Sequence, residues 1–259
     1  MEKPALLIKL GGSIITDKQK PYVARLEHLR ALSQILVRIH QPLIIAHGSG
    51  SFGHTSAAEY GGGHGYKDKW GVAKVSRDAM AINSIVMDSL LDAKIPAISL
   101  RPASLTIADT GELSEAFFTP VKLALSQGLV PVLYGDVIWD KAWQSTIFSG
   151  ETILSYVAEY LIRSDVPVEQ VIELCDTDGV LDSNKKTIPE IMPENWHKIL
   201  SVFFASKTKD VTGGMQHKVE EALRLAKKGI MTRIINGNNV KEVEAVLLRN
   251  IALGTLIHT

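Results

Sequence analysis

The stretch ALLIKLGGS, residues 5–13, joins an apolar run to a lysine, two glycines and a serine. Ala5–Leu10 is apolar almost throughout rather than alternating, which is typical of a strand in a parallel sheet covered on both faces. Glycine lets the backbone approach a phosphate group closely, and Lys9 would add a positive charge. The stretch therefore predicts a buried strand that ends at an anion site. A plain turn beside a solvated lysine is the alternative for these residues alone.

Apolar runs of this kind alternate with longer helical patterns along the chain. The alternation predicts βαβ units with right-handed crossovers, and hence an α/β fold. An exception is Val130–Phe148, where Asp140-Lys141-Ala142 separates two β-rich runs and predicts a hairpin. The glycines at 61–63 predict a flexible loop. Strands are expected at Ala5–Leu10, Pro42–Ala46, Ala97–Leu100, Val130–Tyr134, Gln170–Cys175 and Thr232–Asn236, and helices at about Ala24–Ile39, Gly71–Ala93, Thr119–Gln127, Gly150–Ile162, Gly214–Lys228 and Val240–Leu248.

Length and composition narrow the class of protein. The 259 residues suffice for a sizeable core, and no linker marks a boundary, so we expect a single domain over residues 1–259. The 28 basic residues balance the 28 acidic ones, which argues against a nucleic-acid partner. The single cysteine, Cys175, excludes an intramolecular disulfide. No apolar run reaches the roughly 18 residues of a membrane span, so we expect a cytoplasmic protein without a membrane partner.

Four glycine-bearing segments lie at expected strand ends or helix starts: Lys9–Ser13, His47–His54, Ser149–Glu151 and Thr212–Gly214. In open α/β sheets, ligands gather at the carboxyl ends of strands, where loops and helix N-termini present free N–H groups. Each segment could be a plain tight turn, but four of them in one chain favour phosphate binding.

The segment His47–His54 contains the spacing G-x-G-x-x-G, which also occurs in dinucleotide-binding proteins. Those proteins carry an acidic residue about 20 positions further on, at the end of the next strand. The candidate here is Asp68, which has no strand before it, so NAD binding is disfavoured. Of the flanking histidines, His54 at the expected helix start is better placed to bind a substrate phosphate. A structural histidine bonded to the backbone is the alternative.

Two segments in the C-terminal half carry further polar groups. Asp176-Thr177-Asp178-Gly179 follows an apolar strand, so its carboxylates are expected at the same sheet edge. Lys218 lies on the first turn of the helix that begins near Gly214, where the lysine and the backbone N–H groups would form a second pole for phosphate oxygens. Alternatively, Asp178-Gly179 is a common turn and Lys218 is one of several surface lysines.

These segments, in this order, resemble the amino acid kinase superfamily and, within it, the isopentenyl phosphate kinases. The resemblance covers nearly the whole chain, and the octet that ends in His54 is its narrower signal. The matching motifs are KLGGS at Lys9–Ser13, TDK at Thr16–Lys18, HGSGSFGH at His47–His54, YGD at Tyr134–Asp136, SGE at Ser149–Glu151, TDGV at Thr177–Val180, and DVTGGM at Asp210–Met215 with Lys218 beyond it.

The resemblance implies a three-layer αβα sandwich with a mostly parallel central sheet, usually assembled as a homodimer. The N-terminal half, about residues 1–150, would hold the phosphoryl acceptor, and the C-terminal half, about residues 151–259, would hold ATP. The implied reaction is Mg²⁺-assisted phosphorylation of isopentenyl phosphate by ATP to isopentenyl diphosphate, which feeds isoprenoid biosynthesis. The alternatives are a phosphonate kinase of the fosfomycin type and a nucleotide-binding protein without turnover.

The resemblance also implies roles for individual residues, none of them as a metal ligand. Glu151 stands where the family usually has aspartate, and its extra methylene could displace the lysines that it orients. The helix Gly71–Ala93 would flank an isoprenoid tail, with plain core packing as the alternative for its methionines. The catalytic residues would be Lys9, Lys18, His54, Glu151 and Lys218; the ATP-binding residues Lys9, Gly11, Gly12, Ser13, Gly50, Asp176, Thr177, Asp178, Gly179, Gly214 and Lys218; and the acceptor-binding residues Ser49, Gly50, His54, Gly150, Met80 and Met87.

Overall fold

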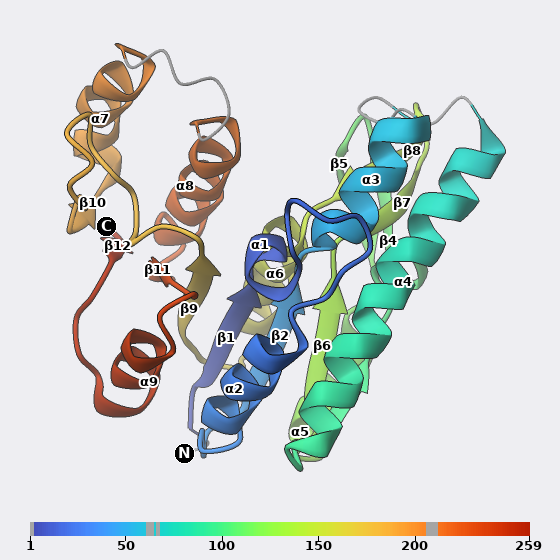
Figure 1. Cartoon of the computed structure of the whole chain (residues 1–259), viewed down its shortest axis with the longest axis horizontal. Coiled ribbons are helices and arrows are strands. Elements are labelled where there is room, and N and C mark those ends of the chain that lie inside the picture. Colours follow the sequence, from blue (N-terminus) through green and yellow to red (C-terminus); the bar gives the residue numbers. More distant parts are fainter. Residues whose placement is uncertain (1–2, 61–64, 66–67, 206–211) are drawn as a thin grey trace.

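Within the described residues, 3–60, 65, 68–205 and 212–259, eight strands form the central sheet in the order β10-β12-β11-β9-β1-β2-β6-β3. In this computed structural model the strands pair in parallel except β11 with β12 (Figure 1). The predicted parallel sheet is therefore confirmed, and it draws strands from both halves of the chain. The strands are β1 Ala5–Leu10, β2 Leu43–His47, β3 Ala97–Ser99, β6 Val130–Tyr134, β9 Val168–Cys175, β10 Glu190–Ile191, β11 Thr232–Asn236 and β12 Thr255–Ile257.

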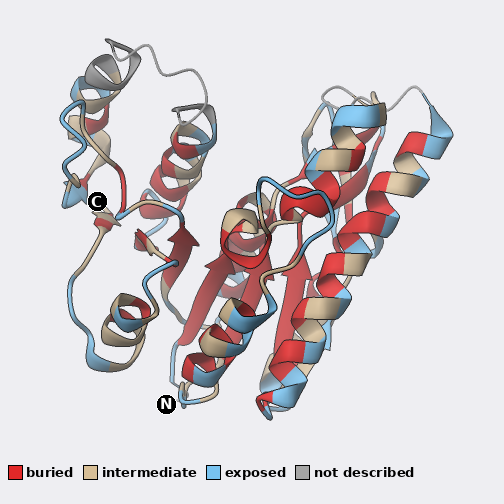
Figure 2. Ribbon diagram, viewed as in Figure 1, coloured by how far each residue is buried: buried red, intermediate tan, exposed pale blue. Residues whose placement is uncertain are grey.

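Helices cover both faces of this sheet. Alternate residues of each strand point to opposite sides, and apolar side chains on both sides are buried by helices. Leu6, Ile8 and Leu10 of β1 pack with α2, α4 and α9 in one hydrophobic cluster. Ala5 and Leu7 pack with α5, α6 and α8 in another. Figure 2 shows the sheet and the inner stripes of the helices as buried, which confirms the three-layer αβα sandwich. The helices are α2 Leu26–Leu36, α4 Lys69–Asp92, α5 Thr119–Ser126, α6 Gly150–Arg163, α8 Thr212–Ala226 and α9 Val240–Arg249.

A smaller sheet of the described chain has the order β5-β4-β7-β8. β7 and β8 form the predicted hairpin, with Asp136 opposite Phe148 and Asp140 opposite Gln144. The Asp140 carboxylate accepts hydrogen bonds from backbone N–H groups of its own turn and of the β4–β5 turn, so it ties the two turns together. The strands are β4 Thr106–Asp109, β5 Glu112–Ala116, β7 Asp136–Asp140 and β8 Gln144–Phe148.

Several elements were not predicted: α1 Gly12–Ile15, α7 Pro193–Ala205, and the β4–β5 hairpin. For α3 Gly50–Tyr60, only a helix start at His54 was expected. The predicted elements occur where expected, with ends that shift by a few residues. The glycine loop at 61–63 and residues 210–211 of the DVTGGM motif lie outside the described residues. In the part of the chain that is described, no helix combines the length and apolar character that crossing a membrane requires.

Candidate active site

A cavity of ≈ 750 Å³ lies at the carboxyl ends of β1, β2 and β9. α3 and α6 begin at its edge with Gly50 and Gly150, so the positive ends of both helix dipoles face it. Sequence reasoning did not assign Gly48, Ser51, Gly135, Ile147, Phe148, Ser149, Cys175, Met215 and His217, which also line it. The predicted residues that line it are Lys9, Gly11, Gly12, Ser13, Lys18, Ser49, Gly50, His54, Gly150, Glu151, Asp176, Thr177, Gly214 and Lys218.

The glycine loops after β1 and β2 touch each other backbone to backbone. A Cβ atom on Gly12 would lie 2.7 Å from the N and Cα atoms of Gly50. Gly50 has a φ of +50°, and a Cβ atom there would lie 2.1 Å from Oγ1 of Thr16. That hydroxyl accepts a hydrogen bond from the N–H of Ser51 and donates one to the carbonyl of Gly12. Glycine is therefore required at both positions, because side chains would force the two loops apart.

Glu151 holds two lysines from distant parts of the chain. Lys9 on β1 donates a hydrogen bond of 2.6 Å to Oε1 of Glu151, and Lys218 on α8 donates to the same oxygen. The side chains of Lys9 and Glu151 are only 4% and 7% exposed. Burial alone would raise the pKa of Glu151, but the two lysine charges outweigh it and hold the pKa well below its usual value. The carboxylate is therefore ionised and fixes both ammonium groups at one point of the cavity.

Lys18 also lines the cavity, and it pairs with a different carboxylate. Its ammonium group donates to Oδ2 of Asp176 at 2.6 Å, and both side chains are substantially exposed. Burial would raise the pKa of Asp176, but its contact with Lys18 lowers it. An exposed pair of this kind contributes little stability, so Lys18 can exchange this partner for a ligand at low cost.

The two histidines of the octet have different environments. His54 lies on α3 and lines the cavity, and burial followed by the charge of Lys18 lowers its pKa, so the ring is mainly neutral at pH 7. His47 is fully buried, bonds to the Gly48 carbonyl and to Asn83, and stacks on Tyr134. His47 is therefore a structural residue, whereas His54 is available to a ligand, as the sequence favoured.

Four predicted residues lie outside this cavity. Asp178 accepts a hydrogen bond of 2.7 Å from Asn236, and Gly179, with a φ of +119°, forms the turn that follows β9. These two residues shape the loop rather than line the cavity. Met80 is 43% exposed and lines a second cavity of ≈ 570 Å³ between α4 and the β7–β8 hairpin. Met87 packs against the main core cluster, so the structure does not bring it to either cavity.

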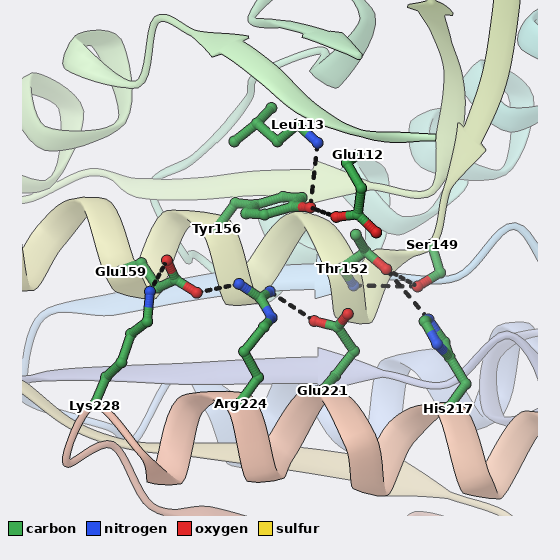
Figure 3. Close-up of polar contacts among 10 residues, drawn as sticks. All are labelled: Glu112, Leu113, Ser149, Thr152, Tyr156, Glu159, His217, Glu221, Arg224 and Lys228. Carbon is green, nitrogen blue, oxygen red and sulfur yellow. Dashed lines mark hydrogen bonds and ion pairs between the residues drawn. The ribbon is translucent and has the colours of Figure 1, made fainter. Parts of the chain in front are cut away.

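Ion pairs fasten α8, which carries Lys218, onto α6, which carries Glu151 (Figure 3). The carboxylate of Glu159 on α6 binds Arg224 of α8 and Lys228, which lies two residues beyond the end of α8. Arg224 also pairs with Glu221 and lies over the ring of Tyr156, 4.8 Å from its centroid. At the end nearest the cavity, His217 contacts Thr152, whose backbone N–H is capped by the Ser149 hydroxyl. The contact between α6 and α8 therefore sets the spacing between Glu151 and Lys218.

Comparison with known proteins identifies the family. The model of the amino acid kinase family matches residues 4–236. The chain belongs to this family. Within it, the isopentenyl phosphate kinase of Methanothermobacter thermautotrophicus is 33% identical over 97% of this chain and 98% of its own length. That of Methanocaldococcus jannaschii is 30% identical over 93% of this chain and 94% of its own.

Solved structures give the same result. A structure of isopentenyl phosphate kinase matches with a TM-score of 0.82 at 29% identity, covering 98% of this chain and 100% of that one. The product complex of the Thermoplasma acidophilum isopentenyl phosphate kinase gives 0.77 at 26% identity, with 98% and 99% covered. By contrast, the acetylglutamate kinase of Nautilia profundicola matches only 62% of this chain, over 54% of its own length, at 29% identity. The chain is thus a member of the isopentenyl phosphate kinase branch, and the resemblance seen in the sequence is confirmed.

Proposed function

We propose that this chain transfers the terminal phosphoryl group of ATP to isopentenyl phosphate, giving isopentenyl diphosphate for isoprenoid biosynthesis. The observation that carries this proposal is the cluster of Lys9, Glu151 and Lys218, which shares one cavity with His54 and the glycine loops. The relatives that match over nearly the whole chain are isopentenyl phosphate kinases, which favours this acceptor over a phosphonate. The presence of all these residues in one cavity also favours turnover over nucleotide binding alone.

Phosphoryl transfer requires alignment of the reactants and positive charge on the transferring oxygens more than covalent chemistry. Lys9 and Lys218 would supply that charge, because Glu151 holds their ammonium groups on a single oxygen atom. The backbone N–H groups of Gly11, Gly12 and Ser13 would bind the nucleotide phosphates. Lys18 would leave Asp176 to stabilise the transition state. In this arrangement Glu151 orients the lysines and makes no bond to the reacting groups.

The acceptor phosphate would lie at the start of α3. The neutral His54 ring can donate one N–H to it, beside Ser49, Gly50 and Gly150. Ala57, one helical turn after His54, packs in an apolar cluster with Val75 and Val137. Val137 also lines the second cavity, together with Val72 and Met80. We place the isoprenoid tail along this apolar path, which includes Met80 and leaves out Met87.

Mg²⁺ is part of the proposal as the ion that neutralises ATP charge during transfer. The acidic side chains that line the cavity are Glu151 and Asp176, and both are paired with lysines. The ion's ligands would therefore come chiefly from phosphate oxygens and water, as Mg²⁺ sites in kinases commonly do. The division into an acceptor half and an ATP half, and a homodimeric assembly, remain predictions; sedimentation at several concentrations tests the second.

A coupled assay of ADP release tests the proposed reaction. The protein is supplied with Mg-ATP and, in parallel, with isopentenyl phosphate or fosfomycin. We expect turnover with isopentenyl phosphate alone, and a product that mass spectrometry identifies as isopentenyl diphosphate. Turnover with fosfomycin alone would overturn the acceptor while leaving the lysine roles intact. ATP binding without turnover on either acceptor would overturn the enzymatic function itself.

A further inference from the structure

A second buried carboxyl group lies beside the lysine cluster. Glu173 on β9 is directly opposite Lys9 on β1 in the parallel register, so the two side chains point to the same face of the sheet. Glu173 is 4% exposed, and its neighbours along the buried part of β9 are apolar. Within the described part of the chain, its Oε2 atom is buried and has no hydrogen-bond partner. A buried, unpartnered carboxyl oxygen is costly, so this position calls for an explanation.

The titratable groups near Glu173 come from β1, β9, α6 and α8. They are Lys9 from β1, Glu151 from α6, Lys218 and Glu221 from α8, and Cys175 two residues along β9. On the β11 side its partner in the register is the apolar Ile234. Burial, followed by the charge of Glu151, raises the pKa of Glu173 to about 7, because these two effects outweigh the lysines. Glu151 already occupies both lysines, which leaves Glu173 without a cation of its own.

We propose that Glu173 is a positioning residue for phosphoryl transfer that acts in its protonated form, by leaving the lysine pair one carboxylate short. With Glu173 neutral, the cluster has two ammonium charges against the single carboxylate of Glu151. If Glu173 ionises, two carboxylates balance two ammonium groups, and the lysines are drawn toward the sheet and away from the phosphates. Because bound phosphates are anionic, they favour the protonated form of Glu173. This inference rests on the proposed function.

The test compares the wild-type protein with Glu173→Gln, which keeps the shape of a protonated glutamate but cannot ionise. The profile of kcat/KM for Mg-ATP between pH 6 and 9 reports the free enzyme. Above about pH 7 the wild-type value should fall by about tenfold per pH unit, whereas the value for Glu173→Gln should not show this fall. The corresponding fall in kcat should occur at higher pH, because bound phosphates retain the proton. Profiles with the same alkaline limb in both proteins would overturn the proposal.

A matched control removes another buried, unpartnered polar atom from the same sheet. Thr232→Val deletes the Oγ1 atom of a fully buried residue on β11. Its pH profile should follow that of the wild type, since Thr232 carries no ionisable group. A shift equal to that of Glu173→Gln would show that the profile responds to packing rather than to charge, and would also overturn the proposal.

A carboxyl titration of the wild-type protein by ¹³C NMR gives a readout that needs neither turnover nor a variant that folds. One glutamate should titrate near pH 7 and move to higher pH when Mg-ADP or Mg-ATP is added. The absence of such a carboxyl group, or a shift to lower pH on nucleotide addition, refutes the role of Glu173. If isopentenyl phosphate is not phosphorylated but this titration responds to nucleotide, the proposed acceptor fails and the inference about the lysine site stands.

Discussion

Glu151→Gln is the perturbation that most directly tests how the lysines are held. The change preserves the size of the side chain and removes the charge that Lys9 and Lys218 share. Because both ammonium groups bind one oxygen atom, their nitrogens lie within about 5 Å of each other. At an effective dielectric constant of about 20, two like charges at that distance repel by about 3 kcal/mol. Lys9, 4% exposed, cannot move into water to relieve this repulsion.

We therefore expect two effects of Glu151→Gln. The free energy of unfolding should fall by roughly 3–5 kcal/mol, the usual loss when one partner of a buried ion pair is removed. The turnover number should fall about 100-fold or more, because displacing a catalytic group by about 1 Å is enough for such a loss. Denaturant titration measures the first effect, and the coupled ADP-release assay at saturating substrates measures the second. Glu151→Asp, which keeps the charge on a side chain shorter by one methylene, should regain most of the turnover.

Glu159→Gln is the matched control for this prediction. Glu159 lies on the same helix, is likewise 7% exposed, and binds two cations, Arg224 and Lys228, away from the cavity. Its loss should lower stability by less, because Arg224 and Lys228 are 32% and 49% exposed and can turn to water, and it should leave kcat within about twofold of wild type. The reasoning is refuted if folded Glu151→Gln turns over like the wild type. It is also refuted if Glu159→Gln loses as much kcat, since the loss would then follow from α6 packing.

Three further predictions concern other parts of the molecule. His54→Ala should raise KM for the acceptor at least tenfold and leave the Kd of ATP unchanged by calorimetry; unaltered acceptor kinetics would remove His54 from that site. Glu173→Gln should stabilise the fold increasingly as pH rises from 5 to 8, by up to about 3 kcal/mol. The pKa of Glu173 is raised on folding from 4.5 to about 7, so its contribution to stability is favourable at low pH and is lost as pH rises through 7. A difference in melting temperature between the variant and the wild type that does not grow with pH would contradict this. Met87→Ala should lower the free energy of unfolding by roughly 1–3 kcal/mol without changing which isoprenoid chain lengths are accepted. Acceptance of longer isoprenoid monophosphates would show that Met87 contacts the tail.

The parts of the fold that the sequence predicted are those set by local pattern. β1 is apolar on both faces, so its residues alone indicate a strand covered by helices on each side. The beginning of α3 was missed, with a helix start expected only at His54, because its first turn contains Gly50, Ser51 and Gly53, which have low helix propensity and are typical of a loop. β5 was missed because Glu112–Ala116 is largely exposed and lacks the alternation that marks a half-buried strand.

The composition of the site was harder to predict, because it depends on contacts between distant segments. The family resemblance brought Lys9, Glu151 and Lys218 together, whereas their own neighbours in sequence do not indicate that they meet. Glu173 was not assigned, although a carboxylate within an apolar strand was a visible signal; only the register with Lys9 shows what it faces. Met87 was assigned to the tail because the resemblance places its helix there, with core packing as the alternative; an apolar helix face in the sequence does not distinguish the two.

The position of β1 in the sheet has a consequence during synthesis. β1 leaves the ribosome well before β9, and one of its edges pairs with β9, where Leu10 meets Leu174. Until Cys175 has emerged, that edge presents free N–H and C=O groups on a strand that is apolar on both faces. Such an edge is a template for pairing between chains. A central strand of the finished molecule thus has an unpaired edge until β9 has been made. Slowing translation between α6 and β9 should therefore increase aggregation and the need for chaperones.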